Sequence, residues 1–359
     1  MPGWQNLTER LYQESAFVPP IRQRLRAIFD AQDDWYGTSV GFYAVEDDRG
    51  NLLARSTVQH NDSFDAKLGA RVQLFGFTEF VESYEVFETL MAGIEAIGRE
   101  NGRTSLLGPA NLLPNEYGGV ITSGFHERGF LDTAYNPPYY PEFYASRGFE
   151  RRFASATYIC ASLRTGPDPD SILRFDDTRM AAERLEIHYG DRKRFAAQVR
   201  LLLAMLNASF SVRPYYTEIA PEEMSKRMEG LDYVLDERLL IYLTRAGEPV
   251  AFIICVPDIS SFVATVRGNL NAFNQIALAA IHRKYRREAI VIVGGAIPGC
   301  EATGYFRLLM RQLFRNLKAA GYDAVRATSV ENDNPAARSA FVRMGGRKLH
   351  ELTYYVRRL

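Results

Sequence analysis

One order of predicted elements occurs twice along the 359 residues, and this repetition limits the possible folds. The first copy consists of a hairpin at 40–46 and 52–58, a strand at 71–77, a helix at 84–100, a strand at 104–107, a short helix at 141–146 and a strand at 153–163. The second copy consists of a hairpin at 239–244 and 250–256, a strand at 289–297, a helix at 305–320, a strand at 324–330, a helix at 335–344 and a strand at 348–357. The spacing of apolar residues and the turn residues support each element. We therefore predict an α+β fold made by duplication of one unit, each copy a mixed, mostly antiparallel sheet flanked by helices.

This repetition divides the chain into four predicted segments. We expect a helical lead-in at 1–35, an N-terminal domain at 36–163, a linker at 164–181 and a C-terminal domain at 182–359. The linker begins with proline, glycine and aspartate, which favour turns and interrupt regular elements.

Composition narrows the class of protein. Forty-three basic residues balance 43 acidic ones, so an extended nucleic-acid surface is disfavoured. We see no signal peptide and no apolar run near the ~20 residues of a membrane helix, and we expect a cytoplasmic protein without membrane association. Three cysteines and five histidines show no metal-ligand spacing, so we expect no structural metal. Cys160 and Cys255 lie in apolar strands and are expected in the core, whereas Cys300 lies in a loop and stays open.

The second copy carries the clearest motif. An apolar strand at 289–297 leads through Pro298-Gly299-Cys300-Glu301-Ala302-Thr303-Gly304 into a helix, and Asn334-Pro335-Ala336-Ala337 opens another helix after the next strand. Successive backbone amides at a helix N-terminus form a site for a pyrophosphate. The passage resembles the GNAT (GCN5-related N-acetyltransferase) superfamily, whose members bind acyl-coenzyme A on such a strand–loop–helix. An ordinary strand-to-helix turn is the alternative.

The resemblance extends to the first copy. Its segments 135–140 and 108–111, and the closing residues 354–359, resemble a bacterial group of tandem GNAT proteins with largely unassigned activity. The ending at 144–149 matches the family pattern Tyr-x-x-x-Gly-Phe. The loop at 78–83 has no glycine and two carboxylates, Glu79 and Glu82, so we expect no pyrophosphate there.

The resemblance to the GNAT superfamily also implies a cofactor and a set of site residues. It implies acetyl-coenzyme A or another acyl-coenzyme A as cofactor, held by Ile297, Gly299, Thr303, Gly304 and Tyr305. It implies catalytic roles for Tyr144, as a general acid, and Asn334. Core packing is the alternative for Tyr144.

Three residues depart from the family pattern. Glu301 stands at a basic or amide position, Phe306 at a small-residue position, and Phe341 where the family often has a tyrosine acid. We expect Phe341 to pack in the core.

An aromatic segment is the predicted substrate wall. Tyr135, Asn136, Tyr139 and Tyr140 combine apolar bodies with polar tips, and neighbouring prolines stiffen the segment. The alternative is a packing surface between the two halves, and both can hold.

Basic residues flank the second-copy loop. Arg283, Lys284, Arg286 and Arg287 precede its strand, and Arg307, Arg311, Arg315 and Lys318 share one face of its helix. A solvated face is one interpretation, and contact with coenzyme phosphates or a tRNA backbone is the other.

The leading hypothesis is an acyl-coenzyme A-dependent N-acyltransferase with its cofactor in the C-terminal domain and a small-molecule or peptide amine as acceptor. An aminoacyl-tRNA-dependent transferase and a non-catalytic GNAT-like binding protein are the alternatives, so tRNA remains a possible partner. The oligomeric state is left open.

Overall fold

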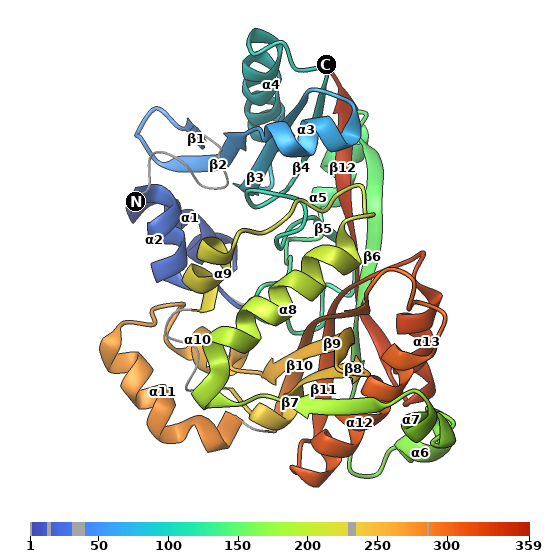
Figure 1. Ribbon diagram of the computed structural model, residues 1–359. Helices are drawn as coiled ribbons and strands as arrows, with labels where there is room; N and C mark the ends of the chain where they lie inside the picture. Colours follow the sequence, from blue (N-terminus) through green and yellow to red (C-terminus); the bar gives the residue numbers. More distant parts are fainter. Residues whose placement is uncertain (1, 13–15, 31–39, 229–234, 286) are drawn as a thin grey trace. The chain divides into compact units, whose positions relative to one another are not determined.

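The computed structural model describes residues 2–12, 16–30, 40–228, 235–285 and 287–359 (Figure 1). The chain forms two compact units. The N-terminal unit contains the described residues of 1–155 with 214–217 and 350–359, and the C-terminal unit contains those of 156–213 and 218–349. The chain passes between the units within the long strands β6 (Glu150–Cys160) and β12 (Arg347–Arg358), and also on either side of the segment 214–217. The expected domain boundaries stay predictions, and the boundary at 35/36 lies outside the described residues.

The N-terminal unit contains α1 (Pro2–Leu11), α2 (Arg22–Asp30), β1 (Gly41–Glu46), β2 (Leu52–Gln59), α3 (Asp62–Leu68), β3 (Val72–Phe80), α4 (Tyr84–Glu100), β4 (Ser105–Gly108), β5 (Val120–Ser123) and α5 (Tyr140–Ser146). Strands β1, β2 and β3 pair antiparallel in sequence order, and β3 pairs parallel with β4. A parallel pair needs a crossover, and α4 supplies it.

Helix α4 shows how local sequence specifies this unit. The Ser83 side chain accepts the Val86 amide at the N-terminus, and Gly102 follows the end with a φ of +62°. Its apolar stripe is buried, and it consists of Phe87, Leu90, Met91 and Ile94. The predicted helix at 84–100 is therefore confirmed, with its cap.

The C-terminal unit contains α6 (Pro169–Ile172), α7 (Thr178–Ala182), β7 (Leu185–Tyr189), α8 (Phe195–Phe210), α9 (Pro221–Met228), β8 (Leu240–Arg245), β9 (Glu248–Pro257), α10 (Ser260–Thr265), α11 (Ala272–Tyr285), β10 (Glu288–Ala296), α12 (Tyr305–Ala319), β11 (Ala324–Glu331) and α13 (Pro335–Arg343). Its strands lie in the order β7-β8-β9-β10-β11; the first three neighbouring pairs are antiparallel, and β10–β11 is parallel.

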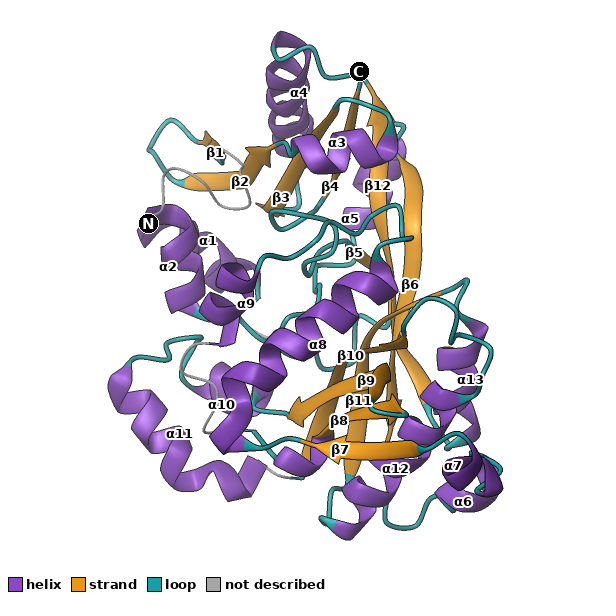
Figure 2. Ribbon diagram, viewed as in Figure 1, coloured by secondary structure: helices purple, strands orange, loops and turns teal. Residues whose placement is uncertain are grey.

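Adjacent glycines on β10 show that helices cover both faces of this sheet. A side chain on Gly294 would meet Phe306 of α12, whereas one on Gly295 would meet Ser209 and Phe210 of α8. Successive strand residues point to opposite faces, so α12 and α8 pack on opposite sides of β10 (Figure 2).

Both units share two antiparallel pairings followed by a parallel pairing across a helix. The predicted α+β fold with mostly antiparallel sheets and flanking helices is thereby confirmed. Helix α11 was not predicted. Two of its large apolar residues are exposed, Phe273 at 76% and Ile276 at 71%. Its apolar residues therefore do not mark one buried helix face, which is the pattern that predicts an amphipathic helix.

The expected core residues are found inside. Phe341 is buried beside Tyr158 and Phe314, which confirms its predicted packing role. Cys160 and Cys255 are buried as predicted, and Cys300, left open by the sequence, is buried too.

Candidate functional site

The loop between β10 and α12 is built around two left-handed glycines. Gly299 and Gly304 both have a φ of +85°, a region that glycine enters without a Cβ clash. The Ile297 amide donates to Val250, which fixes the start of the loop on β9. Gly304, at the N-cap position of α12, has no side chain to offer the first-turn amides, and the Thr303 hydroxyl one residue earlier accepts the Tyr305 amide.

Thr303 and Tyr305 brace the loop from within. The Thr303 hydroxyl donates to Cys300 O at 2.7 Å and accepts the Tyr305 amide at 3.3 Å. The Tyr305 ring is buried and its hydroxyl donates to Glu183 at 2.5 Å. The side chains of these two predicted residues thus hold the loop in shape.

Two of the three departures from the family pattern, Glu301 and Phe306, lie in or beside this loop. The Glu301 carboxylate accepts the Gly299 amide at 2.9 Å, within the first half of the loop. The Phe306 ring packs against Gly294, where a Cβ would come within 2.9 Å of it. A glycine on β10 therefore compensates for the bulk of Phe306.

The ladder between β10 and β11 ends before either strand does. Paired residues run from Glu288–Ala324 to Val291–Ala327, and the Thr328 hydroxyl donates to Ile292 O at 2.7 Å. Strand β10 continues to Ala296, still paired with β9 on its other side. Beyond the pair Val291–Ala327, the second half of β10 therefore has an edge on the β11 side that is not part of the β10–β11 ladder.

Glu331, the last residue of β11, lies at the same end of the sheet as this edge, because parallel strands end on one side. Its side chain is 18% exposed, and Arg213 Nη1 lies 2.9 Å from Oε2. Burial raises the pKa of Glu331 to about 7, against the opposing effect of Arg213 and with a further rise from Asp333. A carboxylate with this pKa exchanges a proton near neutral pH.

Asn334 holds the turn that carries Glu331. Its side chain accepts the Ala337 amide at 3.2 Å and caps α13, and its own amide donates to Glu331 O at 3.1 Å. The structure therefore places this predicted catalytic residue in a helix cap next to a titrating carboxylate.

The basic face of α12 holds the segment at 164–181. Arg311 is buried, and Lys318 donates to two backbone carbonyls of that segment, both at 3.0 Å. Two ion pairs to the same segment measure 2.5 Å each, Arg311–Asp177 and Arg315–Asp170. Arg311 is therefore not part of a solvated face, whereas the Arg315 side chain is 42% exposed and lies at the surface in its ion pair. Contact of this face with coenzyme phosphates or a tRNA backbone stays a prediction. Arg307 is exposed.

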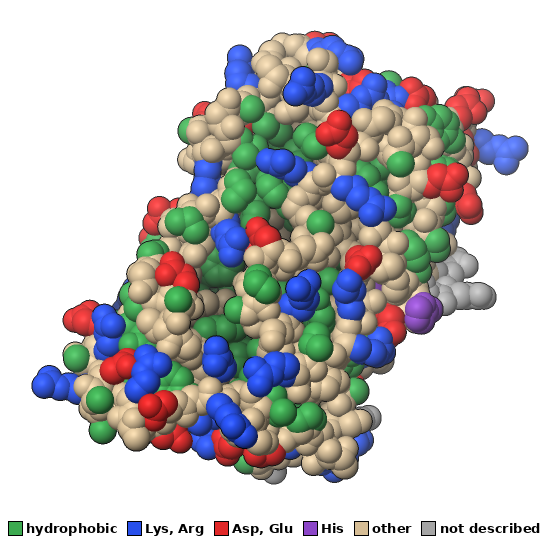
Figure 3. Space-filling model, turned by 90° about the vertical axis from the view of Figure 1, so that its right-hand side faces the viewer, with side chains coloured by type: hydrophobic (Ala, Val, Ile, Leu, Met, Phe, Trp, Pro, Cys, Tyr) green, Lys and Arg blue, Asp and Glu red, His purple; other side chains and the backbone are tan. Residues whose placement is uncertain are grey.

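Of the second basic cluster, the side chains of Arg283, Lys284 and Arg286 lie outside the described part of the chain. Arg287 pairs with Asp323 at 2.8 Å. Basic side chains on the face in Figure 3 lie among acidic and hydrophobic ones, as the zero net charge suggests.

Tyr144 lies in the core of the N-terminal unit. Its ring stacks on Tyr355 at 4.6 Å and meets Phe87 edge-on at 5.1 Å. Burial raises the pKa of its phenol well above the usual value. Its role as a proton donor stays a prediction.

A cavity of about 90 Å³ in the N-terminal unit brings together predicted substrate residues. Tyr135, Asn136 and Tyr140 line it, and the Tyr139 ring lies beside that of Tyr140, tilted by 54° with the centroids 5.2 Å apart. The Asn136 side chain accepts the Ile121 amide at 2.6 Å and so anchors β5 beside the cavity.

Sequence reasoning missed the charged pair in this wall, Arg55 and Glu79. The predicted strand ended at 77, but β3 continues to Phe80 and places Glu79 directly opposite Arg55 of β2. The sequence offered one indication of this pair: Glu79 lies between Thr78 and Phe80, at the end of a strand rich in aromatic residues. Burial raises the pKa of Glu79, with Arg55 acting in the opposite direction.

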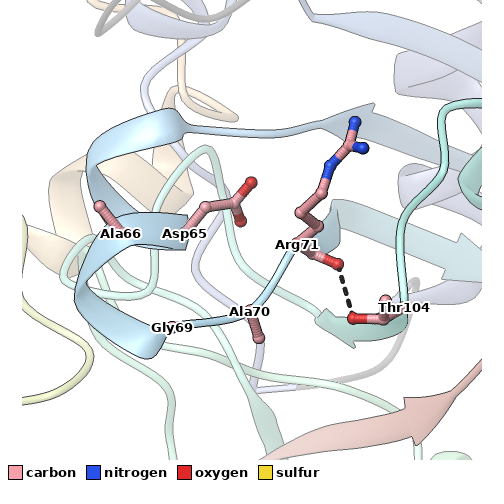
Figure 4. Close-up of a pocket in the computed structure, with 6 residues that line it drawn as sticks. All are labelled: Asp65, Ala66, Gly69, Ala70, Arg71 and Thr104. Carbon is pink, nitrogen blue, oxygen red and sulfur yellow. Dashed lines mark hydrogen bonds between the residues drawn. The ribbon is translucent and has the colours of Figure 1, made fainter.

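A second hollow, of about 550 Å³, lies between α3 and the start of β4 (Figure 4). Its polar groups have partners in the chain. The Thr104 hydroxyl donates to Arg71 O at 3.1 Å, Arg71 donates to Asn101 O, and Asp65 accepts the Val72 amide. These contacts serve the fold, so we do not assign a site here.

No described helix combines the length and apolar character needed to cross a bilayer.

Comparison with known sequences gives distant relatives. No protein-family profile matches the chain. Bacterial ceramide synthase of Caulobacter vibrioides is 25% identical over 199 residues, covering 55% of this chain and 51% of its own. Protein YghO of Escherichia coli is 20% identical over 224 residues, covering 62% and 57%. The chain thus spans just over half the length of these curated relatives.

Comparison with solved structures gives the fold. A tandem GNAT protein from the clavulanic acid biosynthesis pathway matches with a TM-score of 0.56 and 13% identity, over 99% of this chain and 94% of its own. A GCN5-related N-acetyltransferase from Sphaerobacter thermophilus matches with a TM-score of 0.52 and 10% identity, over 93% and 85%. The resemblance drawn from the motifs is confirmed: the chain has the fold of the GCN5-related N-acetyltransferases, a tandem protein among them.

Proposed function

We propose that the chain is an acyl-coenzyme A-dependent N-acyltransferase whose C-terminal unit binds the acyl donor. The observation that carries this proposal is the early end of the β10–β11 ladder, followed by a glycine turn and the N-terminus of α12, whose N-cap residue is the glycine Gly304. A strand edge with available amides and a helix N-terminus are the two features that a thioester and a pyrophosphate require.

The loop fits the cofactor. Gly304 lets the backbone approach a phosphate closely, and the helix dipole of α12 favours negative charge at this end. Glu301, the residue that would repel a pyrophosphate, has its carboxylate on the Gly299 amide. We assign Ile297, Gly299, Thr303, Gly304 and Tyr305 to this site. Ile297, Gly299, Thr303 and Tyr305 shape the loop through their own hydrogen bonds, and the backbone from Gly304 into the first turn of α12 would contact the pyrophosphate.

In the proposed reaction Glu331 is the general base. Acyl-coenzyme A supplies an activated acyl group as a thioester. Glu331 accepts a proton from the attacking ammonium, so that the neutral amine forms the new C–N bond. The C–S bond of the thioester then breaks, and the departing coenzyme A sulfur takes up the second proton released by the nitrogen. Amides on the free edge of β10 stabilise the negative charge on the carbonyl oxygen. Asn334 positions Glu331 through the turn that they share.

The acceptor is an amine. A ceramide is an amide of a fatty acid, so the name of the Caulobacter relative points to a lipid amine as well as to the small-molecule or peptide amine that the sequence suggests. We therefore expect the acyl chain length of the donor to matter.

Titration with acyl-coenzyme A donors tests the proposal. We expect saturable heat with acetyl-, octanoyl- or palmitoyl-coenzyme A in calorimetry, and a preference among these chain lengths. Silence with all three at millimolar concentration would overturn the assignment of a donor site. It would favour a non-catalytic protein, or an aminoacyl-tRNA-dependent enzyme if tRNA then binds with a steep salt dependence.

Replacing Gly304 by tryptophan is expected to abolish donor binding, because the side chain would stand at the first turn of α12 and the backbone needs a positive φ. Gly321→Trp is the matched control. Gly321 follows the other end of the same helix with a φ of +78° and open space around it. It should unfold at a similarly reduced temperature but bind the donor normally. Equal donor affinity in both variants would place the site elsewhere.

A further inference from the structure

The cavity in the N-terminal unit contains two charged side chains with bonding capacity left over. Arg55 is 7% exposed, and its Nε is buried with no hydrogen-bond partner. Its Nη2 donates to the Thr8 hydroxyl at 2.5 Å. Glu79 is 12% exposed, and only one of its oxygens, Oε2, accepts the Tyr12 and Tyr140 hydroxyls, both at 2.9 Å.

Arg55 and Glu79 do not satisfy each other. The distance from Arg55 Nη2 to Glu79 Oε1 is 3.9 Å, which exceeds the length of a hydrogen bond. A buried donor, Arg55 Nε, and a largely buried carboxylate, whose second oxygen accepts no described hydrogen bond, thus line one cavity. Native proteins leave few such groups, because each costs free energy when it is cut off from water.

The charged side chains that line the cavity favour a ligand with no net charge. Arg55 and Glu79 cancel, and Asp132 at the same cavity pairs with Arg24 at 3.0 Å. A ligand with net charge would bring one uncompensated charge into a buried site. A zwitterion would add none, because its carboxylate would match Arg55 and its ammonium would match Glu79.

Size and lining limit the ligand further. The volume is about 90 Å³, below the roughly 150 Å³ of an apolar cavity that takes benzene. The remaining walls include Trp4, Phe77 and Tyr117, which offer apolar surface, and the Arg55 guanidinium already lies over the Trp4 ring, 4.5 Å from its centroid. Only a few non-hydrogen atoms can enter.

We propose that this cavity binds a small zwitterion of the α-amino-acid type, with its ammonium on Glu79 and its carboxylate on Arg55. The cavity lies wholly within the N-terminal unit. The proposal is independent of donor binding by the C-terminal unit, and either can fail alone.

The test compares three probes of similar size on the full chain at pH 7. L-Alanine carries both charges, propionate lacks the ammonium, and ethylamine lacks the carboxylate. In calorimetry or ligand-observed NMR, we expect L-alanine to bind at least about tenfold more tightly than either analogue, since each lost contact is to a charged group. No saturable L-alanine binding at tens of millimolar, or equal binding of an analogue, would overturn the proposal.

Variants locate the site. Glu79→Gln is expected to weaken L-alanine binding about tenfold or more, and so is Arg55→Met. Glu82→Gln, an exposed carboxylate three residues further on, is the matched control and should bind normally. Tyr140→Phe removes one hydroxyl from Glu79 and serves if Glu79→Gln does not fold, with a smaller loss expected. Undiminished binding in a folded Glu79→Gln or Tyr140→Phe protein would contradict the assignment.

Discussion

Replacing Glu331 by glutamine is expected to lower kcat/KM for acyl transfer by about 10²–10⁴-fold, the usual worth of a positioned general base. Glutamine keeps the size of the side chain but cannot accept a proton. The carboxylate lies at the end of β11, where the ladder with β10 has stopped, and it titrates near neutral pH. Steady-state kinetics with the donor identified by calorimetry measures the loss.

The pH profile gives a second signature of Glu331. A base acts only when deprotonated, so kcat/KM should rise with pH through about 7 in the wild type. That limb should be absent in Glu331→Gln. Activity that falls without any change in the shape of the profile would argue against Glu331 as the base.

The Glu331→Gln substitution should lower activity but raise the free energy of unfolding. The folded pKa of about 7 lies above the usual 4.5, so the folded state holds the proton more tightly than the unfolded state does. Wild-type stability therefore falls as pH rises from about 4.5 to 7 and remains lower above it. Glu331→Gln avoids this loss, and at pH 8 it should gain up to about 3 kcal/mol of unfolding free energy. A slower but more stable variant cannot be explained by misfolding.

Asp333→Asn is the matched control for Glu331. Asp333 is 76% exposed and contributes to the raised pKa of Glu331. Its removal should shift the low-pH limb to lower pH and leave the maximal rate nearly unchanged. A loss of rate as large as that of Glu331→Gln would contradict the assignment of the base to one carboxylate.

The sequence predicted elements whose signals are local. The bounds of α4 follow from Ser83, an apolar stripe and Gly102, all within twenty residues. The parallel strand pairs were implied by a helix between two strands. Helix α11 was missed because large apolar residues on it are exposed.

The candidate sites depend on contacts that sequence spacing does not reveal. Glu79 meets Arg55 because β2 and β3 pair with a bulge, which no local pattern indicates. The raised pKa of Glu331 depends on its burial and on Arg213, 118 positions away in the sequence. The burial of Arg311 on α12 was not predicted, because its partner Asp177 lies in a segment that looked like a linker.

A buried ion pair at the base of the C-terminal sheet should dominate the stability of that unit. Arg326 of β11 is 7% exposed and donates to Asp258 at 2.9 Å and to Glu288 at 2.6 Å. Asp258 is 1% exposed and also accepts the Ser260 amide at 2.8 Å. These contacts tie β11 to the end of β9 and the start of β10.

We expect Arg326→Met to lower the free energy of unfolding by about 3–5 kcal/mol in urea titration, because it removes a hydrogen-bonded cation from a carboxylate that is 1% exposed. Arg287→Met is the matched control. Arg287 also pairs with an aspartate, at 2.8 Å, but is 70% exposed, so its loss should cost less than about 1 kcal/mol.

The double variant Arg326→Met/Asp258→Asn separates the pair from the packing around it. Asparagine removes the stranded charge and can still accept the Ser260 amide, so the double variant should recover most of the stability lost in Arg326→Met. If the double variant is no more stable than Arg326→Met, lost packing of the arginine stem is the cause and the ion pair is not. A cost below about 1 kcal/mol in Arg326→Met itself would show that the pair contributes no more than an exposed one.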